Sequence, residues 1–171
     1  VLAVLERAGC TLTRQEGTLR LQCCRLRAAG PIRTAPYDGF PTDAQAPLMA
    51  AMAVAEGVTV FEENLFEDRF RHVPALRALG AHIHAARRYA VVTGVRELHG
   101  ASMTATDLRG GAALVIAALA ARGRSRIADT GHIDRGYACF VQMLTELGAQ
   151  IEREMPCGST CEKKTPSKKQ I

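Results

Sequence analysis

Charged side chains stand at the starts of three apolar segments of this sequence. Asp43 follows a turn rich in proline and glycine, and Asp107 lies two residues before Arg109. Arg135 lies in a polar turn before the third segment. The first turn of a helix presents free backbone N–H groups and the positive end of the helix dipole, and both favour anions. Since arginine binds carboxylates and phosphates through paired hydrogen bonds, the pattern predicts a site for an anionic ligand.

The elements that must position these side chains recur along the chain. A short apolar helix followed by Gly, a small residue, a variable residue and an aliphatic residue is predicted at 8–12, 79–83 and 147–151. The interval is roughly 70 residues, which is typical of a repeated supersecondary unit. Each of the two later units begins with a Thr-Asp pair, continues through an apolar helix to a glycine (Gly57 or Gly123), and then has a short β-rich run, a charged turn and a second helix.

Local residue preferences define the order of elements within one unit. Thr and Asp are good N-cap residues, and Gly57 and Gly123 are good residues to follow a helix end. Hairpins are predicted between 10–13 and 18–23 and between 81–85 and 89–93. In the third helix, Tyr137, Phe140, Val141, Leu144 and Leu147 are expected on one face. The fold class is therefore α/β (α+β), built from repeated β-α-β-α-β-β units.

The repeat also predicts the organisation of the chain. Residues 1–35 contain only the closing half of a unit, so we expect a fragment that starts within a repeat. One partial domain is expected over 1–154, consisting of this closing half and two further units, and a basic, disordered tail is expected over 155–171. Most of the net charge of +5 lies in that tail, which favours a solvated end over a nucleic-acid arm.

Composition excludes several other classes of protein. Hydrophobic residues make up 47% and charged residues 23% of the 171 residues, as in globular proteins. The longest apolar run, Ala112–Ala121, is too short to span a bilayer, and with no secretory signal recognised we expect a cytoplasmic protein. Of the six cysteines, Cys157 and Cys161 form a lone C-x3-C pair. A zinc site needs about four ligands, so no metal site is predicted.

Four motifs occur in one order, at 39–43, 63–70, 105–109 and 132–137: Gly-Phe-Pro-Thr-Asp, Glu-Asn-Leu-Phe-Glu-Asp-Arg-Phe, Ala-Thr-Asp-Leu-Arg and His-Ile-Asp-Arg-Gly-Tyr. Together they resemble the enolpyruvyl transferase family, in particular its members that act on UDP-N-acetylglucosamine. The resemblance covers 1–154 and implies an inside-out α/β barrel, here incomplete. It also implies that the family's other domain is missing, together with its mobile-loop cysteine and its phosphoenolpyruvate-binding lysine.

The resemblance implies an activity and a set of site residues. The reaction is transfer of the enolpyruvyl group from phosphoenolpyruvate to the 3-hydroxyl of UDP-N-acetylglucosamine, the first committed step of peptidoglycan precursor synthesis. It needs no cofactor, and the missing domain is the implied partner, with no nucleic acid and no membrane. The implied catalytic residues are Asp43 and Asp107, and Asp43 also binds substrate. The implied contacts are Arg69 and Arg109 to the phosphoenolpyruvate carboxylate, Arg135 to its phosphate, and Leu65 and Phe66 to the nucleotide sugar.

Alternatives remain for these residues. Asp43 could be only a helix cap, Asp107 could only orient Arg109, and Leu65 and Phe66 could belong to the core. The chain could also be a non-catalytic remnant that binds a nucleotide sugar or a partner. Departures from the family's pattern lie near the helix starts, namely Asp38, Pro47 and the pair Gly110-Gly111. Pro47 would remove a backbone hydrogen bond if it lay beyond the first turn of its helix, and the glycine pair is expected to soften the start of the second helix.

Overall fold

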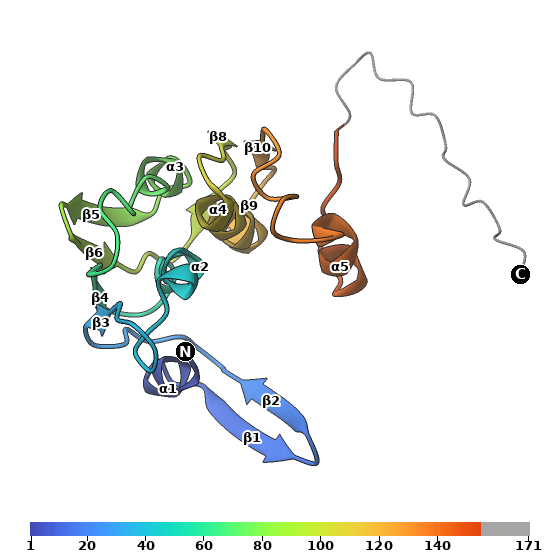
Figure 1. Ribbon diagram of the computed structural model, residues 1–171. Helices are drawn as coiled ribbons and strands as arrows, with labels where there is room; N and C mark the ends of the chain where they lie inside the picture. Colours follow the sequence, from blue (N-terminus) through green and yellow to red (C-terminus); the bar gives the residue numbers. More distant parts are fainter. Residues whose placement is uncertain (155–171) are drawn as a thin grey trace, which may run out of the picture. The chain divides into compact units, whose positions relative to one another are not determined.

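The computed structural model describes residues 1–154 (Figure 1). Within these residues the chain forms two compact units, one over Val1–Phe140 and one that begins at Val141. The predicted tail at 155–171, with Cys157 and Cys161, lies outside the described residues. Within residues 1–154, no helix has the length and apolarity needed to cross a membrane.

The first elements form a short helix and a hairpin. Helix α1 (Leu2–Arg7) precedes the antiparallel strands β1 (Thr11–Gln15) and β2 (Thr18–Gln22), in which Thr11 pairs with Gln22. Glu16 and Gly17 adopt positive φ at the turn between the strands. The first hairpin predicted from the sequence is therefore confirmed.

The next elements form one complete unit in the predicted order. They are β3 (Ile32–Arg33), the 3₁₀ helix η1 (Thr42–Ala44), α2 (Gln45–Met52), β4 (Val58–Glu62), α3 (Val73–Ala78), β5 (His82–Ala86) and β6 (Tyr89–Thr93). Their sheet has the order β3-β4-β6-β5, with β3 parallel to β4 and the other two pairings antiparallel. The β-α-β-α-β-β order is thus confirmed for this stretch.

The remaining elements begin a second unit of the same kind. They are β7 (Leu98–His99), β8 (Ser102–Thr104), α4 (Leu108–Ala120), β9 (Ala121–Arg122), β10 (Arg126–Ala128) and α5 (Phe140–Glu146). Strand β8, which precedes α4 in the sequence, pairs in parallel with β10, which follows it. Strand β7 pairs in parallel with β9. Since α5 begins only at Phe140, the expectation that Tyr137 lies on a helix face is wrong, and Tyr137 belongs to the preceding turn.

The recurring glycine phrase forms the same helix ending each time. Gly9, Gly80 and Gly148 have φ angles of +90°, +93° and +92°. In each case the glycine amide donates to the carbonyl three residues back, and the next amide donates to the carbonyl five residues back. This is the Schellman motif, in which a left-handed residue closes the helix and glycine carries no Cβ penalty.

The other two glycines predicted to end helices do not do so. Helix α2 ends at Met52 and α4 ends at Ala120, each before the expected glycine. After α2, the backbone of Glu56 hydrogen-bonds to residues 26 and 28, so the chain leaves the helical path before Gly57. After α4, the chain enters β9 at once, because β9 pairs with β7. Gly57 and Gly123 keep positive φ, but in turns outside the helices.

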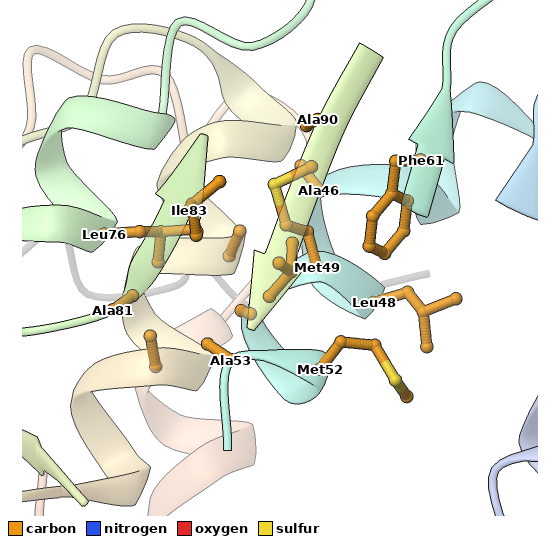
Figure 2. Packing of buried hydrophobic residues seen from close by; sticks show 14 of the residues in the cluster. Ala46, Leu48, Met49, Met52, Ala53, Phe61, Leu76, Ala81, Ile83 and Ala90 are labelled. Atoms are coloured by element: carbon orange, nitrogen blue, oxygen red, sulfur yellow. The ribbon is translucent and has the colours of Figure 1, made fainter. Parts of the chain in front are cut away.

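Helices α2 and α4, which belong to successive repeats, pack against each other in the core of the compact unit Val1–Phe140. Helix α2 is buried on nearly every side, with Ala46, Met49 and Met52 at 2% exposure or less (Figure 2). An apolar helix of this kind is stable only when other elements surround it. Pro47 lies in the first turn of α2, where its missing N–H has no helical partner to lose, so the expected disturbance is absent at this position.

The glycine pair at the start of α4 permits close packing. A Cβ on Gly111 would lie 2.7 Å from Ile133 Cγ1, and one on Gly110 would lie 3.1 Å from His72 Cβ. Both residues are buried, and α4 runs through them without interruption. The expected softening of this helix start is therefore outweighed by tight contacts that only glycine allows.

We expect Gly111→Ala to destabilise the chain although alanine is the better helix former. Overpacking of this kind costs about 1–3 kcal/mol, more than the gain in helix propensity. Thermal unfolding of both proteins measures the difference. Ile133→Ala is the matched partner: if it does not recover part of the loss in a double-mutant cycle, the proposed contact is not the cause.

Candidate functional site

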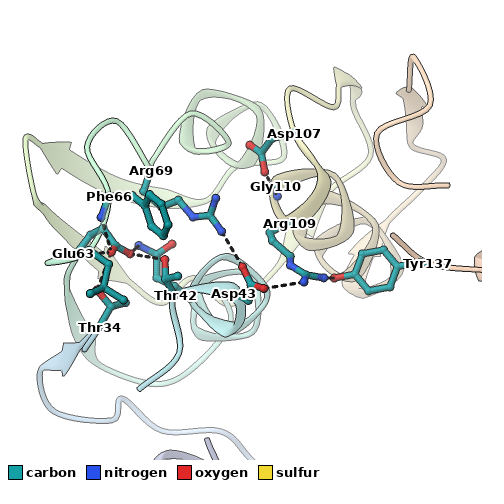
Figure 3. A network of polar contacts seen from close by, with 12 residues as sticks. Thr34, Thr42, Asp43, Glu63, Phe66, Arg69, Asp107, Arg109, Gly110 and Tyr137 are labelled. Atoms are coloured by element: carbon teal, nitrogen blue, oxygen red, sulfur yellow. Dashed lines mark hydrogen bonds and ion pairs between the residues drawn. The ribbon is translucent and has the colours of Figure 1, made fainter. Parts of the chain in front are cut away.

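The carboxylate of Asp43 lies between two guanidinium groups (Figure 3). Its Oδ2 accepts a hydrogen bond from Arg109 Nη2 at 2.7 Å, and its Oδ1 accepts one from Arg69 Nη2 at 3.2 Å. Asp43 belongs to η1, Arg69 to the loop between β4 and α3, and Arg109 to the first turn of α4. The fold therefore brings together three of the residues that the sequence singled out.

The interpretation of Asp43 as a helix cap is wrong. The residue before η1 is Pro41 and the N-cap of α2 is Ala44, and neither helix has a side-chain cap hydrogen bond. Charge-assisted hydrogen bonds to guanidinium groups are roughly twice as strong as neutral ones, which explains why the carboxylate turns toward the arginines.

Arg109 has a second partner that sequence reasoning missed. Its Nη1 donates to the Tyr137 hydroxyl at 2.9 Å, and its Cζ lies 5.4 Å from the centre of the Tyr137 ring. The preceding residue, Gly136, allows this approach, since a Cβ there would lie 2.5 Å from Leu108 Cδ2. The sequence signal for this contact was the glycine before an aromatic residue, Gly136-Tyr137, in a polar turn.

The two arginines favour the charged form of the Asp43 carboxyl group. The hydrogen bond from Arg109 holds the pKa of Asp43 below its ordinary value, with weaker support from Arg69 and with partial burial opposing. In turn, Asp43 and then Tyr137 raise the pKa of Arg109. The cluster therefore holds one anion between two cations, and its excess positive charge suits a further anionic group.

Asp107, unlike Asp43, is a helix N-cap, at the start of α4. Its Oδ1 accepts a hydrogen bond from the Gly110 amide at 2.8 Å, at the start of α4 (Figure 3). The other oxygen receives a hydrogen bond of 3.4 Å from Thr106 Oγ1. Its carboxylate thus contacts the helix start rather than the Arg109 guanidinium.

The loop after β4 presents two apolar side chains to solvent. Leu65 is 39% exposed and Phe66 is 55% exposed, so the interpretation that they belong to the core is wrong. The Arg69 Cζ lies 5.5 Å from the centre of the Phe66 ring. Arg135 is exposed in the turn before α5 and, within the described residues, does not hydrogen-bond to the cluster around Asp43.

His72 is a buried titratable residue beside α4. It is 2% exposed, and burial lowers its pKa to about 4, although the negative charge of Asp107 opposes this shift. Its Nε2 has no hydrogen-bond partner within the described residues. The folded state therefore keeps this imidazole neutral down to acidic pH.

We expect His72 to make the chain less stable as pH falls. The His72 imidazole binds a proton near pH 6.5 in the unfolded state but only near pH 4 in the folded state. The free energy of unfolding therefore decreases as pH falls through this interval. The full effect is about 3 kcal/mol. Urea unfolding at pH 7, 6 and 5 should show a smaller loss in His72→Leu than in the parent chain. If the free energy of unfolding falls with pH equally in the two proteins, His72 is not the cause. His84→Leu, at an exposed histidine, is the control.

Comparison with known proteins identifies the family. Residues 1–154 match the profile of the EPSP synthase (3-phosphoshikimate 1-carboxyvinyltransferase) family, and the chain belongs to this family. The fold class inferred from the repeat is thereby confirmed, as an incomplete enolpyruvyl transferase fold.

Particular relatives refine the comparison. The chain is 48% identical over 154 residues to UDP-N-acetylglucosamine 1-carboxyvinyltransferase 1 of Caldanaerobacter subterraneus subsp. tengcongensis, covering 90% of this chain and 37% of the relative. It is also 48% identical to UDP-N-acetylglucosamine 1-carboxyvinyltransferase of Gloeobacter violaceus, covering 91% of this chain and 34% of that protein. The chain thus spans about a third of the length of these relatives.

Solved structures agree with this assignment. The enolpyruvyl transferase NikO from Streptomyces tendae superposes with a TM-score of 0.78 at 32% identity, over 86% of this chain and 34% of NikO. EPSP synthase from Acinetobacter baumannii superposes with a TM-score of 0.63 at 14% identity, over 90% of this chain and 36% of that chain, and shows the fold alone.

Proposed function

We propose that this chain forms part of the active site of a carboxyvinyl transferase that uses phosphoenolpyruvate and UDP-N-acetylglucosamine. The observation that carries the proposal is the position of Asp43 between Arg69 and Arg109, on three segments distant in sequence. The named relatives supply the substrate class, because they are UDP-N-acetylglucosamine 1-carboxyvinyltransferases. The reaction would then serve peptidoglycan precursor synthesis in the cytoplasm.

Proton transfer at the sugar hydroxyl is the role proposed for Asp43. The carboxylate takes the proton of the 3-hydroxyl while the sugar oxygen bonds to C2 of phosphoenolpyruvate and the methylene carbon gains a proton. Loss of a proton from the resulting methyl group and departure of phosphate then restore the double bond. Asp107 is proposed as the second carboxylate in these proton transfers.

The guanidinium groups are proposed to bind the carboxylate of phosphoenolpyruvate. In the structure Asp43 itself occupies the anion position between them, at 2.7 Å from Arg109 and 3.2 Å from Arg69. A ligand carboxylate that takes over these hydrogen bonds removes the largest cause of the lowered pKa of Asp43, which is the hydrogen bond from Arg109. Binding of phosphoenolpyruvate would therefore make Asp43 a stronger base where the reaction needs one.

Further contacts to the substrates are proposed for exposed residues. Leu65 and Phe66 offer an apolar surface to the nucleotide sugar, and Arg135 offers a guanidinium to the phosphate. The competing proposal is a non-catalytic chain that binds only the nucleotide sugar. It predicts binding without turnover, whatever the state of Asp43.

The decisive experiment joins residues 1–154 to the remainder of a full-length relative and measures phosphate release with both substrates. We expect turnover from this chimaera and only background release from the 171-residue chain, because the chain spans about a third of its relatives' length. A folded chimaera that binds the nucleotide sugar but releases no phosphate would refute the transferase proposal and favour the binding alternative.

A further inference from the structure

A buried carboxylate joins several segments beside the cluster around Asp43. Glu63 follows β4 directly and is 1% exposed. Its Oε1 accepts hydrogen bonds from Thr34 Oγ1 at 2.7 Å and from the amides of Leu65 at 2.9 Å and Phe66 at 3.2 Å. Its Oε2 accepts hydrogen bonds from Thr42 Oγ1 at 2.9 Å and from Gln45 Nε2 at 3.5 Å (Figure 3).

All five donors to Glu63 are neutral. A buried carboxylate without a cation recovers its lost hydration only through such hydrogen bonds, so each donor is held at a defined place around it. An apolar side chain of similar volume would fill this space without fixing the donors. The arrangement therefore favours a geometric role over a purely stabilising one.

The two oxygens of Glu63 hold the two sides of the candidate site. Oε2 holds Thr42, the residue directly before Asp43 in η1. Oε1 binds the first part of the loop after β4, which includes Phe66, and the Phe66 ring lies 5.5 Å from the Arg69 Cζ. One carboxylate thus fixes the segment that carries the anion and the segment that packs against one of its cations.

We propose that Glu63 is a positioning residue of the transferase site, which orients Asp43 through Thr42 and orients Arg69 through the loop at Leu65 and Phe66. This inference rests on the proposed function. Sequence reasoning gave Glu63 no role, because its partners Thr34 and Thr42 are distant in sequence.

Thr42 allows one side of this arrangement to be removed by itself. Thr42→Val deletes the hydroxyl that binds Oε2 and keeps the volume of the side chain, whereas Thr42→Ser keeps the hydroxyl. Since a displacement of about 1 Å at a catalytic group can cost about 10²-fold, we expect Thr42→Val to lower kcat of the chimaera by about 10–100-fold. KM should change little, and Thr42→Ser should retain near-normal kcat.

Glu63→Gln tests the carboxylate itself. The oxygen of glutamine can continue to accept from the loop amides, while its NH₂ faces Thr42 and Gln45. The Oε1 of Gln45 has no hydrogen-bond partner within the described residues, so its amide can turn to accept, and the fold should survive. We expect kcat to fall by about 10-fold. Glu62→Gln is the control, because Glu62 binds Arg33 and Tyr89 at the surface instead.

A second measurement on the 171-residue chain does not depend on activity. Hydrogen exchange should become faster in Glu63→Gln at Ala44 and Gln45, whose amides hydrogen-bond within η1, and at Phe66, because the neutral oxygen of glutamine is a weaker acceptor for that amide than the carboxylate. Exchange in Glu62→Gln should match the parent chain. Unchanged exchange at these amides in Glu63→Gln overturns the inference.

The outcomes separate this inference from the proposed function. An inactive parent chimaera counts against the function, and the exchange data then decide the role of Glu63 in ordering η1 and the loop. If the parent is active and Asp43→Asn is not, while Thr42→Val and Glu63→Gln keep normal kcat, the function stands and the positioning role is wrong. Loss of kcat in Thr42→Val that Thr42→Ser does not share supports the positioning role.

Discussion

Replacement of Asp43 by asparagine is expected to lower kcat of the chimaeric transferase by about 10²–10⁴-fold, the usual contribution of general acid–base catalysis. Asparagine keeps the shape of the side chain and one oxygen for the guanidinium groups, but it cannot take a proton from the sugar hydroxyl. KM for the two substrates should change much less than kcat. Steady-state phosphate release with each substrate varied in turn measures both quantities.

Asp68→Asn is the matched control for this change. Asp68 lies in the loop before Arg69, is exposed, and pairs only weakly with Arg71 at 3.9 Å within the described residues. Its φ of +53° is one that asparagine also adopts readily, so the substitution leaves the backbone undisturbed. Near-normal turnover in Asp43→Asn would falsify the role as a base.

The repeat was the part of the fold most open to prediction, because its signals are local. A glycine after an apolar segment specifies a Schellman ending through its own φ, as at Gly80. The same rule gave wrong positions at Gly57 and Gly123, since backbone hydrogen bonds and strand pairing to other segments end those helices earlier. Local preference therefore held only where no tertiary contact competed with it.

In the candidate site, too, the local features could be predicted and the contacts between distant segments could not. The places of Asp43 and Arg109 near helix starts were visible in the sequence, and the family resemblance pointed to Arg69, but the contacts of Asp43 with these two arginines span 26 and 66 residues. Tyr137 was assigned to a helix face by periodicity, and the structure instead places its hydroxyl on Arg109. Periodicity describes an element's own face and carries no information about a partner in another segment.

Arg109→Ala is expected to act mainly on the binding of phosphoenolpyruvate. A hydrogen bond to a charged group contributes about 1.5–3 kcal/mol, so loss of the guanidinium should raise KM for phosphoenolpyruvate by about 10–100-fold. Arg109 binds the ligand carboxylate in the ground state and the transition state alike, so kcat should fall much less than KM rises. The matched control is Tyr137→Phe, which removes only the hydroxyl that receives the 2.9 Å bond from Arg109 and should have a small effect.

The pH profile of the same variant gives a second readout with a defined sign. The hydrogen bond from Arg109 is the largest cause of the lowered pKa of Asp43. Without it the carboxylate takes up a proton at higher pH, so the acidic limb of kcat/KM, which reports the free enzyme, should move to higher pH. Tyr137→Phe keeps the guanidinium and should leave this limb nearly in place. A raised KM with an unmoved acidic limb would show that Arg109 binds substrate without controlling Asp43, and an unchanged KM would remove Arg109 from the phosphoenolpyruvate site.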